Sequence, residues 1–159
     1  MAAHTGQVIT YEDMLKVEHE FAPGLRSHCW GYNGRVHGPT IEGVEGDRVR
    51  IYVTNRLPVS TTVHWHGLML PADMDGGPHQ TIAPGAERTY TYYADPFNGE
   101  TTSLVWDWGN VMTNPRNGLF GSVIVGPKGS RYRDPVTGED ITMKSSWRAD
   151  VVVDRTIPG

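Results

Sequence analysis

Two histidines separated by a single residue form the group in this sequence that is best suited to bind a metal ion. His64 and His66 lie in residues 61–78, TTVHWHGLMLPADMDGGP, where β-formers alternate with other residues and predict a strand over 61–70. Alternate side chains of a strand share one face, so both imidazoles should point the same way, with their Cα atoms roughly 6.5–7 Å apart. Imidazole binds copper, zinc, iron and nickel alike, so the pair predicts a metal site without naming the metal.

The loop after this strand holds two more candidate residues. Asp75 starts an Asp-Gly-Gly sequence that is a strong turn signal, and its carboxylate could also face the histidines. His79 follows the same loop and could approach the pair as a third ligand, although an exposed position is the more ordinary outcome for a loop histidine. Two imidazoles and one carboxylate are also ligand types of zinc hydrolases, an alternative that no other motif here supports.

The composition indicates one compact domain that binds neither nucleic acid nor a membrane. A chain of 159 residues is of ordinary domain size, so residues 1–159 are predicted to form a single domain. The net charge of −4 comes without a basic stripe that could neutralise phosphates. No apolar run approaches the roughly 20 residues of a membrane span. Residues 1–13 also lack the apolar segment of a signal peptide.

Short β-prone runs separated by turn residues predict an all-β sandwich or barrel. The chain has 19 glycines and 11 prolines but no long low-complexity run, as expected for many short strands joined by tight turns. Helix signals are nearly absent, apart from a possible turn at residues 114–117. The predicted strands are 7–11, 15–20, 25–32, 47–54, 61–70, 87–93, 103–108, 119–125 and 149–153.

The order of motifs over residues 39–85 is specific enough to identify a family resemblance. This stretch, PTIEGVEGDRVRIYVTNRLPVSTTVHWHGLMLPADMDGGPHQTIAPG, resembles the first cupredoxin domain of the multicopper oxidases, which include the laccases. Residues 118–140, GLFGSVIVGPKGSRYRDPVTGED, are similar to the segment that closes this domain in many-domain bacterial members. The resemblance implies a Greek-key cupredoxin fold, copper as the cofactor, and reduction of dioxygen coupled to oxidation of a reducing substrate.

The resemblance also implies roles for individual residues. In the family, the first histidine of the HWHG motif binds type 2 copper and the second binds one type 3 copper, which gives these roles to His64 and His66. Asp75 matches the acid that helps to move protons to oxygen. A second HxH pair is expected after a W-Y sequence, but here residues 106–110 read WDWGN. Indole nitrogen offers no lone pair and a carboxamide is a poor copper ligand, so half of the usual ligands are missing.

The cysteine count bears on a further copper type. A type 1 (blue) copper needs a thiolate between two imidazoles, and the only thiol, Cys29, lies near the N-terminus, whereas cupredoxins place theirs in a C-terminal loop. We therefore predict no blue copper, and interpret Cys29 as a small buried apolar residue. A single cysteine also excludes an intramolecular disulfide.

Two interpretations of function follow. In the first, the chain is an oxidase domain that contributes histidines to a type 2/type 3 copper site at an interface, with a homotrimer or other cupredoxin domains of a parent enzyme supplying the rest. In the second, it is a non-catalytic structural or oligomerisation domain that has lost half of its ligands. Related oxidases are commonly exported, and the sequence leaves open whether a natural precursor carries an export signal or the segment belongs to a larger protein. Residues 147–159 are interpreted as an exit strand toward a following domain of a longer enzyme.

Overall fold

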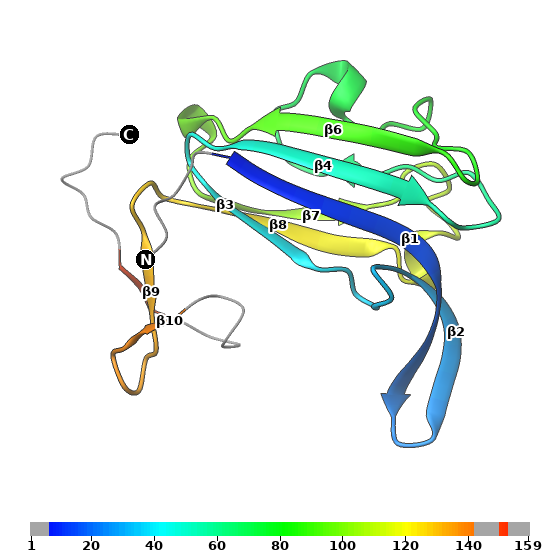
Figure 1. Cartoon of the computed structure of the whole chain (residues 1–159), viewed down its shortest axis with the longest axis horizontal. Coiled ribbons are helices and arrows are strands. Elements are labelled where there is room, and N and C mark those ends of the chain that lie inside the picture. The colour runs from blue at the N-terminus through cyan, green and yellow to red at the C-terminus, as the bar shows by residue number, and fades with distance from the viewer. Residues whose placement is uncertain (1–6, 142–149, 153–159) are drawn as a thin grey trace.

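Two four-stranded β-sheets pack face to face in the computed structural model, which describes residues 7–141 and 150–152 (Figure 1). The sheet orders are β2-β1-β4-β6 and β3-β8-β7-β5. The first sheet consists of β1 (Gln7–Ala22), β2 (Leu25–Tyr32), β4 (Arg48–Asn55) and β6 (Glu87–Tyr93). The second consists of β3 (Thr40–Val44), β5 (His64–Trp65), β7 (Thr101–Trp106) and β8 (Phe120–Gly126). This arrangement confirms the predicted all-β sandwich.

Strand β4 illustrates why these runs of residues form a sandwich. Its side chains alternate between the core and the outside along RVRIYVTN, as the period of two in a strand requires. The core side carries Val49, Ile51 and Val53, none of which is more than 1% exposed. Tyr90 and Tyr92 of the neighbouring strand β6 enter the same core. Burial of each large apolar side chain contributes about 1.5–3 kcal/mol to stability.

Strand β1 differs from the prediction. Separate strands at 7–11 and 15–20 were expected, but Gln7–Ala22 forms one strand of 16 residues. The polar residues Glu12 and Asp13 lie between the two predicted runs, and the Asn33 side chain donates to the Glu12 carboxylate and accepts from the Asp13 N–H. The first part of β1 pairs parallel with β4 and the second part pairs antiparallel with β2. The second part projects from the body as a two-stranded ribbon (Figure 1).

Strand β5 is much shorter than the strand predicted over 61–70. Only His64–Trp65 pairs with β7, at the edge of the second sheet, and Thr61 makes an isolated bridge with Ile82 before it. Gly67 explains the early end, because its φ of +84° turns the chain away from the sheet directly after the second histidine.

A smaller sheet lies outside the sandwich. It has the order β10-β9-β11 and comprises β9 (Arg131–Arg133), β10 (Asp140–Ile141) and β11 (Asp150–Val152) (Figure 1). β11 agrees with the strand predicted at 149–153, whereas β9 and β10 were not predicted. The remainder of the expected exit segment 147–159 lies outside the described residues.

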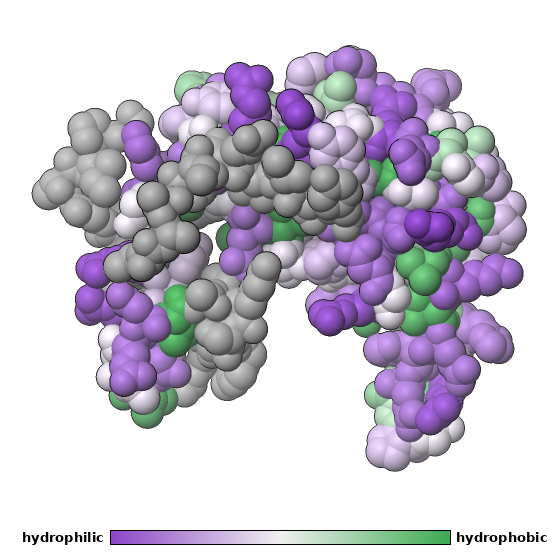
Figure 2. Space-filling view, viewed as in Figure 1, coloured by the Kyte–Doolittle hydropathy of each residue, from purple (hydrophilic) through white to green (hydrophobic). Residues whose placement is uncertain are grey.

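In the part of the chain that the structure describes, helical structure is limited to three short 3-10 turns. These are η1 (Ala72–Met74), η2 (Pro96–Asn98) and η3 (Pro115–Asn117), the last of which confirms the turn expected at 114–117. Among the residues that the structure describes, no helix has the length and apolar character needed to cross a membrane. The face seen in Figure 2 is mostly hydrophilic, with hydrophobic residues in small separate patches.

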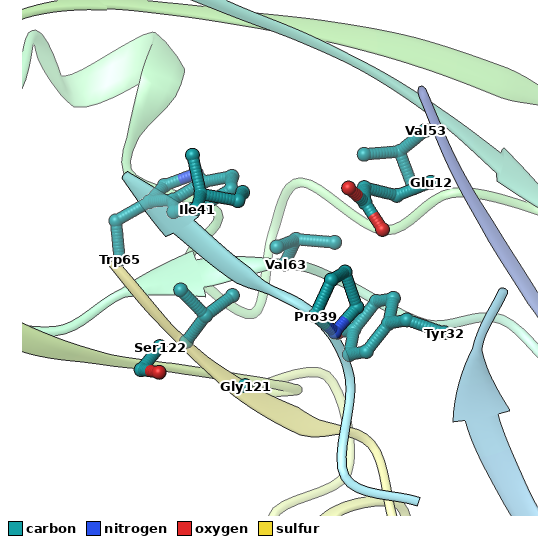
Figure 3. Close-up of a pocket in the computed structure, with 10 residues that line it drawn as sticks. Glu12, Tyr32, Pro39, Ile41, Val53, Val63, Trp65, Gly121 and Ser122 are labelled. Atoms are coloured by element: carbon teal, nitrogen blue, oxygen red, sulfur yellow. The ribbon is translucent and has the colours of Figure 1, made fainter. Parts of the chain in front are cut away.

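A cavity of about 20 Å³ lies between the sheets, on the core side of Trp65 (Figure 3). Its walls are mainly apolar, but Glu12 points its carboxylate into it and Tyr32 lines one side. Burial raises the pKa of the Tyr32 phenol well above its usual value, and the charges of Asp107 and Glu12 raise it further. Burial likewise raises the pKa of Tyr92. These phenols are therefore neutral parts of the core.

Candidate metal centre

His64 and His66 project from the outer face of the second sheet. His64 lies opposite Trp106 in the pairing of β5 with β7, and the His66 N–H donates to the Leu104 carbonyl at 2.9 Å. Trp65, between them, points into the core and is 1% exposed. The two imidazole centroids are 5.7 Å apart. The predicted placement of both imidazoles on one face is therefore observed, although His64 is buried and His66 is exposed.

The backbone of Asp75 holds the His64 ring. Nδ1 of His64 lies 2.8 Å from the Asp75 carbonyl oxygen, which accepts a hydrogen bond from Nδ1 when that nitrogen carries the ring proton. The Asp75 carboxylate is also close, with Oδ1 at 3.4 Å from Nδ1 and the side chain 38% exposed. A proton on Nδ1 leaves the lone pair of Nε2 free, which is the arrangement typical of metal-binding histidines.

A glycine and a glutamine keep this loop against the histidine strand. The backbone of Gly76 has a φ of +70°, and a Cβ atom there would overlap the Val63 carbonyl oxygen. The Gln80 side chain accepts from the Gly76 N–H at 2.8 Å and donates to the Ala72 carbonyl at 2.6 Å. The turn predicted from Asp-Gly-Gly is thus packed directly onto the peptide that precedes His64.

Two tryptophan side chains lie beside the histidines. Trp108, which stands where the resemblance expects a ligand, lies against His64 with ring centroids 4.1 Å apart and an angle of 32° between the planes. Trp106 lies 6.3 Å from His64 and 6.1 Å from His66, again between ring centroids. Asn110, in the second expected ligand position, is exposed. The Trp108 indole therefore covers one face of the His64 imidazole.

Asp107 was missed by the sequence interpretation. It is fully buried and accepts from the Thr62 N–H at 2.9 Å, the Asn110 N–H at 3.0 Å and the Thr61 hydroxyl. The Thr62 hydroxyl in turn accepts from the Trp108 N–H at 2.8 Å. An aspartate between two tryptophans at the end of β7 was the available signal, since charged residues are rarely fully buried without a specific role.

The structure does not gather all the candidate ligands. His79 is exposed in its loop, and Cys29 is buried as a free thiol in β2, as predicted. Within residues 7–141 and 150–152, no three His, Cys, Asp or Glu side chains lie close enough together to hold a metal ion. Imidazole nitrogen is a suitable donor for copper, but the histidine pair supplies only two such donors. A firmly held copper ion would need ligands from elsewhere.

Comparison with known proteins gives the family to which this chain is similar. A family model described as multicopper oxidase matches residues 13–130. The multicopper oxidase mco of Staphylococcus aureus is 47% identical over 73 residues, which cover 46% of this chain and 16% of that protein. Putative laccase-18 of Oryza sativa subsp. indica is 35% identical over 127 residues, which cover 76% of this chain and 20% of that protein. The chain thus spans at most a fifth of the length of these curated relatives.

Solved structures of multicopper oxidases have a fold similar to that of this chain. A multicopper oxidase from Campylobacter jejuni, described as a metallo-oxidase, superposes with a TM-score of 0.74 and 29% identity over 82% of this chain and 28% of that one. The blue copper oxidase from Nitrosomonas europaea gives a TM-score of 0.71 and 29% identity over 82% of this chain and 41% of that one. The sandwich is accordingly of the cupredoxin type predicted from the sequence.

Proposed function

Because this chain belongs to the multicopper oxidase family, we propose that it is a copper-binding domain whose His64 and His66 contribute to a type 2/type 3 site at an interface. That site would serve the reduction of dioxygen coupled to oxidation of a reducing substrate. One observation carries the proposal: two imidazoles share one sheet face, and the buried one is already oriented by the Asp75 carbonyl at 2.8 Å. Metal ligands are commonly held in this way by a hydrogen bond to the second ring nitrogen.

The roles of the chain's own residues follow from their surroundings. Nε2 of His64 would be the atom that binds copper, since Nδ1 is hydrogen-bonded to the Asp75 carbonyl. His66 is exposed, so its imidazole would be accessible to a metal ion shared with a second domain or subunit. Copper held there would supply the one-electron redox chemistry. Trp106 and Trp108 would limit access of water to the buried imidazole.

Copper-loaded protein is expected to be pale. Since Cys29 lies in β2 and is buried away from the histidines, no thiolate is available to give an intense charge-transfer band. Optical and electron paramagnetic resonance spectra after addition of copper(II) measure this directly. The spectrum should be that of a type 2 centre with nitrogen ligands. An intense blue colour would contradict the assignment of Cys29 to the core.

The Asp75 carboxylate is proposed to deliver protons near the site. It is 38% exposed, so it can exchange protons with solvent while lying 3.4 Å from the His64 ring. Asp75→Asn keeps the backbone carbonyl that orients His64 and removes only the ionisable group. We expect copper content to be retained and the rate of oxygen consumption to fall about 10²-fold. An oxygen electrode and metal analysis together distinguish this result from simple loss of copper.

The sheet face that bears the histidines has the character of an interface. Leu104 of β7 is 47% exposed, and Trp106, Phe120 and Ile124 are half-buried on the outside of the sandwich. Their pairing in β7 and β8 lines them up beside His64 and His66. The outer face of a sheet that meets solvent is normally polar, so these apolar side chains next to an incomplete metal site support the idea that a second domain or subunit covers them.

A homotrimer is the assembly that we propose for the isolated chain. Closed cyclic symmetry is the usual form of soluble homo-oligomers, and three copies would bring three histidine pairs to their interfaces. Sedimentation equilibrium with and without copper(II) should give a mass three times that of the 17.6 kDa chain. A monomer that binds copper firmly through these two residues alone would contradict the proposal. Failure of any assembly to bind copper would instead favour the non-catalytic alternative.

A further inference from the structure

The segment that replaces the expected second histidine pair is built around a buried carboxylate. We propose that Asp107 is a positioning residue, which fixes the Trp108 indole against His64 and so keeps the imidazole in the orientation that binds copper. The proposal rests on the proposed copper site. It assigns a function to residues 106–110, which stand where the family resemblance expects a second HxH pair.

The Asp107 carboxylate ties the turn after β7 to the strand that leads into the histidine pair. One oxygen, Oδ2, accepts from the Thr62 N–H at 2.9 Å and from the Thr61 hydroxyl. The other, Oδ1, accepts from the Asn110 N–H at 3.0 Å. The two ends of this clamp therefore lie within three residues of His64 on one side and of Trp108 on the other.

Thr62 then fixes Trp108 itself. Its hydroxyl accepts from the Trp108 N–H at 2.8 Å. The turn is packed closely on this threonine, because a Cβ atom on Gly109 would lie 3.2 Å from Thr62 Cγ2. With its backbone held in this way, Trp108 presents its ring to His64 at 4.1 Å between centroids. The imidazole is thereby confined between the indole and the Asp75 carbonyl.

A carboxylate is the side chain that this clamp requires. All three groups that contact Asp107 are donors, and an ionised carboxylate has only acceptor atoms. An asparagine of the same size would turn an N–H₂ group toward at least one of these donors. Burying a carboxylate without a cation is costly unless its hydrogen bonds are complete. The geometry here completes them with groups that flank His64 and Trp108.

The test compares Asp107→Asn with Asp47→Asn. Asp47 is a matched control because it is also a buried aspartate, 1% exposed, that accepts a hydrogen bond from a backbone N–H, that of Val44 at 2.9 Å. It lies directly before β4, whereas Thr61, a partner of Asp107, lies after the other end of that strand. Loss of a group that orients a ligand typically weakens metal binding about 10–100-fold. We expect this decrease in copper(II) affinity for Asp107→Asn and no change for Asp47→Asn. Equal weakening in both variants would overturn the proposal, as it would reflect stability alone.

A second measurement does not depend on copper. The ring current of Trp108 shifts the His64 ring protons in the metal-free protein, and NMR at one fixed pH should show these resonances moving toward unstacked values in Asp107→Asn but not in Asp47→Asn. Thr62→Val offers a milder change should Asp107→Asn fail to fold, since it removes the acceptor for Trp108 and keeps the shape. Unchanged His64 shifts in both variants would refute the positioning role. If the His64 resonances move in Asp107→Asn as expected but the parent protein takes up no copper, only the proposed copper site is refuted.

Discussion

Replacing His64 and His66 together with alanine is expected to abolish copper(II) binding while the protein stays folded. Both rings lie on the outer face of the edge strand, so neither supports the core that Trp65 enters from the other side. The described part of the chain offers no group of three metal-binding side chains that could take over. Equilibrium dialysis with metal analysis gives the copper content, and near-ultraviolet circular dichroism reports the packing of the tryptophans.

Two single variants sharpen this result. His28→Ala removes an exposed histidine from β2 in the other sheet and should leave copper binding unchanged. His79→Ala tests whether the exposed loop histidine joins the site when metal is present; an unchanged affinity would limit the ligands of this chain to the pair. Copper uptake by the double variant equal to that of the parent would exclude His64 and His66 as ligands.

Local signals predicted most of the sandwich correctly. The alternation of residues 47–54 and 87–93 agrees closely with β4 and β6, because period-two burial is encoded in the strand itself. Prediction failed where contacts distant in sequence decide the structure. β1 continues through Glu12 because this residue pairs with Val53 of β4, and Asn33, 21 residues away, donates to its carboxylate.

The candidate ligands could be named from the sequence, but the groups that hold them in place could not. The spacing of His64 and His66 and the turn at Asp75 were visible in the sequence. The hydrogen bond that orients His64 comes from a backbone carbonyl, which no residue type reveals. The role of Asp107 depends on Thr61 and Thr62, which lie 45 or 46 residues earlier and meet it only in the folded sheet. The supporting contacts join residues that meet only in the folded chain, whereas the candidate ligands stand together in one short sequence motif.

Gly76→Ala should be the most disruptive single-methyl change near the site. The residue has a φ of +70°, and the added Cβ would overlap the backbone carbonyl of Val63, which cannot move without moving His64. Left-handed backbone in a non-glycine residue costs about 1–2 kcal/mol, and overpacking adds about 1–3 kcal/mol. We therefore expect the free energy of unfolding, measured by urea denaturation, to fall by about 2–5 kcal/mol.

The neighbouring glycine provides the control for this change. A Cβ atom on Gly77 would meet only the Asp75 carboxylate, at 3.9 Å, and its φ lies outside the left-handed region. Gly77→Ala should therefore change stability by less than about 1 kcal/mol. Copper affinity should follow the same order, because relief of the overlap in Gly76→Ala must lift the loop and withdraw the Asp75 carbonyl from Nδ1 of His64. Equal stability and equal copper affinity in the two variants would mean that this loop does not hold the histidine in place.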